Sequence, residues 1–81
     1  MSKMFKHAEE IYKYLHNRDW TSPTEIGNRV GGEGKHSSWA SPKMKKMCQA
    51  GTATRSDNGW YKLTPSGEKV AISLIGGIPH E

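Results

Sequence analysis

The sequence has few of the features that mark secreted, membrane or disulfide-linked proteins. Cys48 is the only cysteine among 81 residues, so no internal disulfide can form, and residues 1–10 contain no apolar run that could serve as a signal peptide. No stretch approaches the roughly 20 apolar residues that a membrane-spanning helix needs. We therefore expect a protein of the reducing cytoplasm, without a membrane segment.

The side-chain groupings that catalysis requires are missing as well. The sequence shows no acid pair, no activated nucleophile and no cluster of metal ligands. The glycine-rich stretch 31–34 lacks the Lys-Ser/Thr ending of a phosphate-binding loop, and it follows a predicted helix rather than a strand. We interpret the four histidines as surface residues and Cys48 as an inert core thiol. Neither an enzyme nor a bound metal or cofactor is expected.

Acidic residues are scarce in one part of the chain, between Lys35 and Lys62. This segment carries six lysines and arginines against Asp57 alone, a net charge of +5, whereas the rest of the chain sums to −1 and the whole chain to +4. The positive charge is thus concentrated in one segment. Such a distribution is typical of a protein that attracts a polyanion.

The remaining composition fits one small folded domain over residues 1–81, with a 33% hydrophobic fraction arranged in clear periods. The first helix is predicted from Met4 to Leu15, because its apolar residues share one face. A second, short helix is predicted from the Ser22-Pro23-Thr24-Glu25 capping box to Val30, before Gly31 and Gly32. Trp20, just before that cap, is expected to fill the core.

A third helix must begin between Ser37 and Ser41. A start with Ser41 as the cap and Pro42 at the first helical position is favoured, because an earlier start places proline where a backbone hydrogen bond is lost. Two placements of Trp39 stay open. A start at Ser38 would turn its ring outward beside Lys46, whereas a start at Ser41 would let the ring fold over the core, and we favour the second.

The apolar stripe of this third helix consists of Ala40, Met44, Met47 and Cys48, and Gly51 ends it. Beyond it, the strand-like runs 52–55 and 60–63 are joined through Asn58-Gly59, a strong hairpin signal. Alternation turns Tyr61 and Leu63 inward, and Trp60 and Lys62 outward. A fourth helix follows the Thr64-Pro65 cap, with an expected packed side of Val70, Ala71, Leu74 and Ile75.

Three segments resemble the winged helix-turn-helix domains of prokaryotic transcription regulators, including the MarR-like and ArsR-like repressors. They are residues 22–30, 43–51 and 58–67, and the last contains an aromatic-x-Leu-Thr-x-x-Gly pattern often seen in this fold. Two features depart from it: the glycine-rich link after Val30 is long, which puts the angle between the second and third helices in question, and small residues at Thr52 and Ala53 predict a weakly anchored first strand.

The resemblance implies an α+β fold with a three-helix core, a two-stranded β-hairpin wing and a C-terminal helix. It also implies a DNA-binding regulator that places the third helix, about residues 38–50, in a major groove of double-stranded DNA and the wing, residues 52–63, on the backbone. From charge and hydrogen-bonding capacity, the candidate contact residues are Lys35, Ser38, Ser41, Lys43, Lys45, Lys46, Gln49, Arg55, Asn58 and Lys62.

Two further expectations concern partners. A winged helix can instead act as a protein-interaction module without DNA binding, and Trp39, Trp60 and Ile72 could form an apolar patch for that purpose. Because the C-terminal helix is short, we expect a monomer or a weak homodimer formed through Ile72, Ile75 and Ile78.

Overall fold

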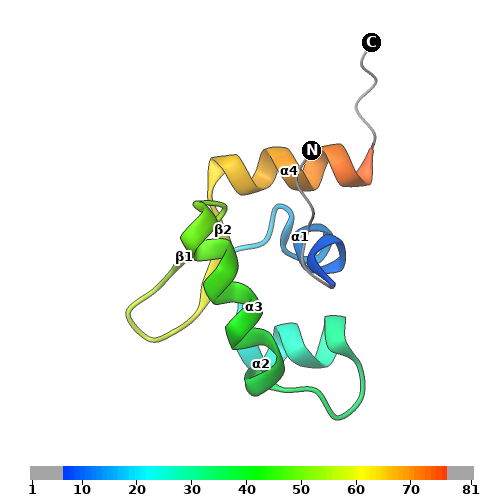
Figure 1. The fold of residues 1–81 in the computed structure, drawn as a ribbon, viewed down its shortest axis with the longest axis vertical. Helices are drawn as coiled ribbons and strands as arrows, with labels where there is room; N and C mark the ends of the chain where they lie inside the picture. Colours follow the sequence, from blue (N-terminus) through cyan, green and yellow to red (C-terminus); the bar gives the residue numbers. More distant parts are fainter. Residues whose placement is uncertain (1–6, 77–81) are drawn as a thin grey trace.

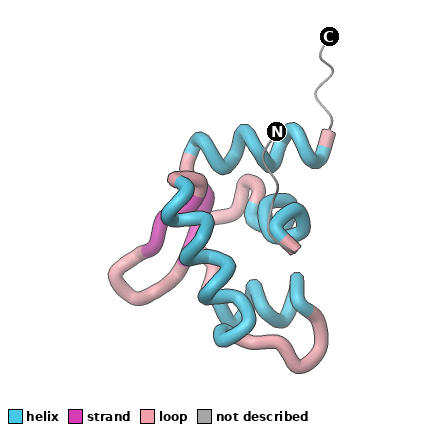
Figure 2. Tube along the Cα trace, in the orientation of Figure 1, coloured by secondary structure: helices cyan, strands magenta, loops and turns pink. Residues whose placement is uncertain are grey.

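The structure, a computed structural model, describes residues 7–76. These residues form four α-helices and a two-stranded antiparallel hairpin, which lies at one side of the molecule beside the third of these helices (Figure 1, Figure 2). In chain order the elements are α1 (Ala8–Leu15), α2 (Pro23–Ile26), a π-helical turn η1 (Gly27–Gly31), α3 (Ser37–Ala50), β1 (Ala53–Arg55), β2 (Tyr61–Leu63) and α4 (Pro65–Ile75). This is the α+β arrangement that the change from helical to alternating periods predicts.

The core is formed where α1 meets the other helices. Ile11 and Leu15 are fully buried on α1, as are Ile26 on α2 and Met44 on α3. Helix α4 crosses over α1, and α3 packs on α2 (Figure 1). Within the described residues α1 begins at Ala8, because His7 has a left-handed φ of 69°. The predicted start at Met4 lies outside the described residues, and the helix does not run continuously through His7.

Helix α2 begins as its capping pattern predicts. The Ser22 hydroxyl accepts a hydrogen bond from the Glu25 amide at 3.2 Å, and Pro23 occupies the first helical position. The Glu25 carboxylate accepts a hydrogen bond from the Tyr14 hydroxyl, which ties α2 to α1. Burial first, and then this bond to Glu25, raises the pKa of the Tyr14 phenol above its ordinary value.

The predicted start of α3 at Ser41 is wrong. The helix begins one turn earlier, at Ser37, and contains Pro42 in its interior. Its first turn is fixed by close backbone packing against η1, because a Cβ on Gly27 would lie 2.3 Å from the carbonyl oxygen of His36. The tertiary contact between Gly27 and His36 therefore determines where α3 begins, rather than the local Ser41-Pro42 capping pattern.

The hairpin pairs Ala53 with Leu63 and Arg55 with Tyr61. Tyr61 and Leu63 face the core, as expected from their alternation. An isolated antiparallel β-bridge pairs Thr21 with Tyr61 of β2, and the two backbones exchange hydrogen bonds of 2.8 and 2.9 Å. The weak anchoring of the first strand stays a prediction; just before that strand, the Thr52 hydroxyl lies 2.8 Å from the Tyr12 hydroxyl.

Helix α4 is capped by Thr64, whose hydroxyl accepts from the Gly67 amide at 3.2 Å. Ala71 is fully buried, and Val70 and Leu74 pack against the core. Ile75 does not belong to the packed side, because 51% of its surface is exposed.

Trp20 does not fill the core, contrary to the sequence-based expectation. Its side chain is 38% exposed and lies on the outer side of the hairpin, with the Lys62 ammonium 5.1 Å from the ring centroid. The neighbouring Thr21 is the residue that turns inward, with only 4% exposure. Because consecutive residues of an extended segment point to opposite sides, the bridge to Tyr61 sends Trp20 outward.

No helix of residues 7–76 is long and apolar enough to cross a membrane.

Candidate nucleic-acid interface

Helix α3 presents an exposed face opposite its buried stripe. Its inner stripe of Ala40, Met44 and Met47 is buried. The exposed positions are Ser38, Pro42, Lys45, Lys46, Gln49 and, at the last residue of the helix, Ala50. Four of them, at positions 38, 42, 45 and 49, follow the i, i+4, i+7, i+11 spacing of a single line along a helix. We call this line the outer ridge of α3.

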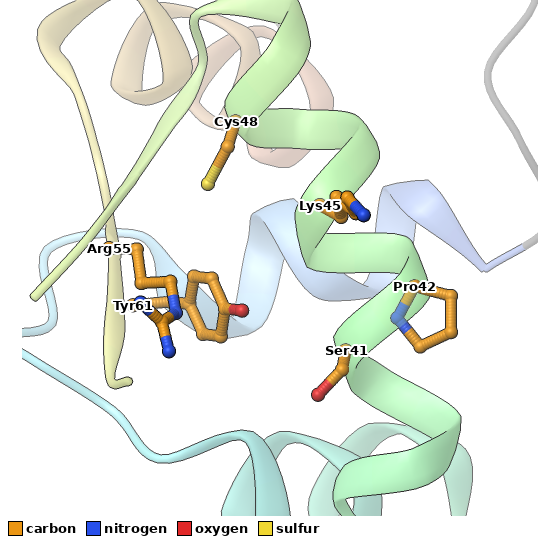
Figure 3. A pocket seen from close by; sticks show the side chains of 6 residues that line it. All are labelled: Ser41, Pro42, Lys45, Cys48, Arg55 and Tyr61. Carbon is orange, nitrogen blue, oxygen red and sulfur yellow. The ribbon is translucent and has the colours of Figure 1, made fainter. Parts of the chain in front are cut away.

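A groove of about 510 Å³ separates α3 from the hairpin. It is lined by Ser41, Pro42, Lys45, Cys48, Arg55 and Tyr61. Figure 3 shows Ser41 and Cys48 pointing from α3 toward the hairpin, with Arg55 and Tyr61 opposite them. Arg55 faces the groove because it pairs directly with the inward-facing Tyr61, and directly paired residues share a face of a sheet.

Two cationic residues line the groove, one on each wall. Lys45 is exposed on α3, and Arg55 is exposed on β1, where its guanidinium lies beside Gly59 of the turn. The Ser41 hydroxyl adds a hydrogen-bond donor between them. A lysine, an arginine and a hydroxyl are the groups that proteins use most often to hold phosphate oxygens. The groove is therefore suited to a strand of nucleic-acid backbone.

The thiol of Cys48 forms part of the groove wall. It is half-buried rather than fully buried, so the expectation of a core thiol is only partly correct. Burial raises the pKa of Cys48, and the positive charge of Arg55 opposes that rise. Burial has the larger effect, so the thiol is protonated at neutral pH and is a weak nucleophile.

Lys43 does not join the outer ridge. Its ammonium lies 4.2 Å from the Trp39 ring centroid and donates a hydrogen bond to the Trp39 carbonyl oxygen at 3.3 Å. The ring also lies beside His7, whose ring centroid is 5.3 Å away. Trp39 is half-buried and packs against the core, although the helix starts early. The proposed link between an early start and an outward Trp39 is therefore wrong.

The last three sequence candidates lie at the edges of this surface. Lys35 is exposed in the link before α3, and Asn58 is exposed at the hairpin turn, where its side-chain oxygen accepts a hydrogen bond from Ser56. Lys62 points to the outer side of the hairpin, where its ammonium lies 3.9 Å from the carboxylate of Asp19. The structure thus brings Ser41, Lys45 and Arg55 together and places Lys62 on the opposite face.

Comparison with known proteins gives two structural neighbours. One is a possible HxlR family transcriptional factor from Thermoplasma volcanium, with a TM-score of 0.68 and 27% identity over 88% of this chain and 66% of that chain. The other is T. acidophilum IdeR, with a TM-score of 0.64 and 16% identity over 98% of this chain and 43% of that chain. The fold is a winged helix.

The two neighbours are longer than this protein, which spans less than two thirds of either chain. No protein-family profile matches the sequence, and no curated protein matches it. The neighbours support the general class of winged-helix regulators. The narrower likeness to MarR-like and ArsR-like repressors stays a prediction.

In the winged helix, α3 occupies the position of the recognition helix, and the hairpin from β1 to β2 is the wing. The hairpin loop projects away from α1 and α4, beside α3 (Figure 1). Sequence reasoning missed three groove residues, namely Pro42, Cys48 and Tyr61. The spacing of Ser41, Lys45 and Cys48 at i, i+4 and i+7 already places them along one side of a helix, but it does not say which side faces the wing.

Proposed function

We propose that this protein is a DNA-binding transcription regulator of the prokaryotic type, with α3 in a major groove and the wing on the adjacent backbone. The observation that carries the proposal is that Lys45 and Arg55, from these two elements, line one groove. Asp57 is the only acid from Lys35 to Lys62, so little negative charge on this segment opposes a phosphate backbone.

The winged-helix fold supports the proposal through geometry. In this fold the recognition helix enters a major groove while neighbouring elements contact phosphates. The outer ridge of α3 offers hydroxyl, ammonium and amide groups of Ser38, Lys45 and Gln49 for such contacts. One neighbour carries the description of a transcriptional factor, which agrees with this role.

The test is the affinity for random duplex DNA, measured by fluorescence anisotropy over a range of salt concentrations. Binding should weaken steeply as salt rises, and each lost phosphate contact should reduce the log–log slope by about 0.9. Lys45→Ala and Arg55→Ala should each show that reduction. Lys13→Ala is the matched control, because Lys13 is an exposed lysine on α1, outside the groove. Absence of salt-dependent binding by the unaltered protein would refute the proposal.

A protein-interaction module is the second candidate, but its surface differs from the patch of Trp39, Trp60 and Ile72 expected from the sequence. Trp39 cannot serve as an exposed anchor, because it is half-buried against the core. Trp20 and Trp60, however, are 38% and 42% exposed, and Trp20 lies on the outer side of the wing beside Lys62. Exposed tryptophans are enriched in protein interfaces. An amide chemical-shift titration with duplex DNA separates the two candidates, since only DNA binding should shift the amides of α3 and Arg55.

A further inference from the structure

Pro42 is the unusual residue of the outer ridge. It is the sixth residue of α3, and a proline there removes the backbone hydrogen bond that its N–H would make to the Ser38 carbonyl. Any of the common helix-forming residues would suit this position better. The ring is also exposed, so burial in the core does not offset the loss.

The surroundings of Pro42 show what the ring can contact. Pro42 stands on the ridge between Ser38 and Lys45, at the rim of the groove, and Figure 3 shows its ring directed away from Tyr61 and the hairpin. It is the only apolar side chain on the outer ridge, whose other members are Ser38, Lys45 and Gln49. If α3 lies in a major groove, this rigid apolar ring faces base edges rather than phosphates.

Base-pair chemistry then limits the choice of contact. A proline side chain has no donor or acceptor, and the one apolar group that a major groove displays is the C5 methyl group of thymine. We propose that Pro42 contacts a thymine methyl group and so makes A·T base pairs part of the recognised sequence; this rests on the proposed DNA-binding function. The amide of Gln49, farther along the same ridge, has the donor and acceptor that match adenine N6 and N7.

The experiment compares two alternating A·T duplexes, one with thymine and one with deoxyuridine, which lacks only the methyl group. Affinities are measured by anisotropy at one fixed low salt concentration. The unaltered protein should bind the thymine duplex about fourfold more tightly, which corresponds to ~0.8 kcal/mol for one buried methyl group. Pro42→Ser should reduce that ratio to about one, because a small polar side chain replaces the apolar ring. This variant regains the backbone N–H, so its melting temperature should not fall.

Gln49→Ala serves as the matched variant on the same ridge. It should weaken binding to both duplexes and keep the thymine preference, because the ring of Pro42 is still present. Equal, salt-sensitive binding of the two duplexes by the unaltered protein would overturn the role of Pro42 and leave the proposed function standing. A thymine preference that persists in Pro42→Ser would overturn it too. Lack of binding to either duplex would overturn both proposals.

Discussion

Gly67 lies directly against the carbonyl oxygen of Thr52, at the junction where the wing meets α4. A Cβ atom on Gly67 would be 2.0 Å from that oxygen, closer than any real contact. The same glycine donates its amide to the capping hydroxyl of Thr64. The Leu-Thr-x-x-Gly pattern thus has a physical basis: threonine caps the helix, and glycine lets the helix approach the first strand.

Gly67→Ala should therefore destabilise the fold strongly. The obstructing atom is backbone, which cannot rotate away, so we expect a loss of about 3 kcal/mol or more in the free energy of unfolding. Thermal and urea denaturation followed by circular dichroism measure the effect. Ser66→Ala, at the exposed neighbouring position, is the control and should change stability little. A Gly67→Ala variant as stable as the control would show that the junction can relax.

Lys43→Ala should behave unlike Lys45→Ala, although both remove a lysine from α3. Lys43 is occupied by the ring and carbonyl of Trp39, so its loss should cost about 0.5–1 kcal/mol of stability. Its effect on the salt slope of DNA binding should be clearly smaller than the 0.9 or so expected for a phosphate contact. Equal changes in the salt slope for the two variants would show that Lys43 also contacts DNA phosphates.

Trp39→Ala should lower stability and affect DNA binding only indirectly. Full burial of an aromatic ring is worth about 3–5 kcal/mol on truncation, and for this half-buried ring we expect about 2 kcal/mol. Denaturation of the variant measures it. A variant that keeps its melting temperature and loses DNA binding would instead assign Trp39 to the recognition surface.

Cys48 provides a chemical probe of the groove, because it is the only cysteine in the sequence. Its raised pKa leaves less thiolate at a given pH, so iodoacetamide should react with it more slowly than with a free cysteine at pH 8. Raising the pH should increase the rate as the thiolate forms. Added duplex DNA should slow the reaction further, and high salt should reverse that protection. A rate that bound DNA leaves unchanged would mean that the groove stays open.

Self-association should be weak. Ile72 and Ile75 are 43% and 51% exposed, at i and i+3 on α4. Two such side chains cover far less than the roughly 1,200–2,000 Å² buried in a stable interface. Ile78, the third residue predicted to take part, lies outside the described residues. Sedimentation velocity should show a monomer at low micromolar concentration, and Ile75→Asp should abolish any dimer seen at higher concentration. A tight dimer at low micromolar concentration would contradict this prediction.

The sequence predicts the elements well where local signals and tertiary contacts agree. Ser22-Pro23 and Thr64-Pro65 each begin a helix, as their cap-and-proline pattern indicates. Ser41-Pro42 has the same pattern and lies inside α3. The difference is the backbone contact between Gly27 and His36, which holds an additional turn and cannot be read from either segment alone.

The sequence predicts the positive charge of the candidate interface, but it does not predict which way each charged side chain points. Lys43, Lys45 and Lys62 look alike in the sequence, yet one lies on Trp39, one lines the groove and one faces Asp19. Two facts separate them, namely the angle of α3 relative to the wing and the register that pairs Arg55 with Tyr61. Both depend on how distant segments pack, so neither follows from periodicity.

The contact between Gly27 and His36 also bears on how this protein can vary. Because Gly27 and His36 meet through their backbones on either side of the link, we expect the angle between η1 and α3 to depend little on the length of residues 32–35. That link turns through Gly32 and Gly34, which have φ angles of 102° and 85°, and a Cβ on either would meet nothing within 4 Å. The link is thus a natural insertion point, where a peptide tag or an additional loop can be accommodated while α3 keeps its orientation.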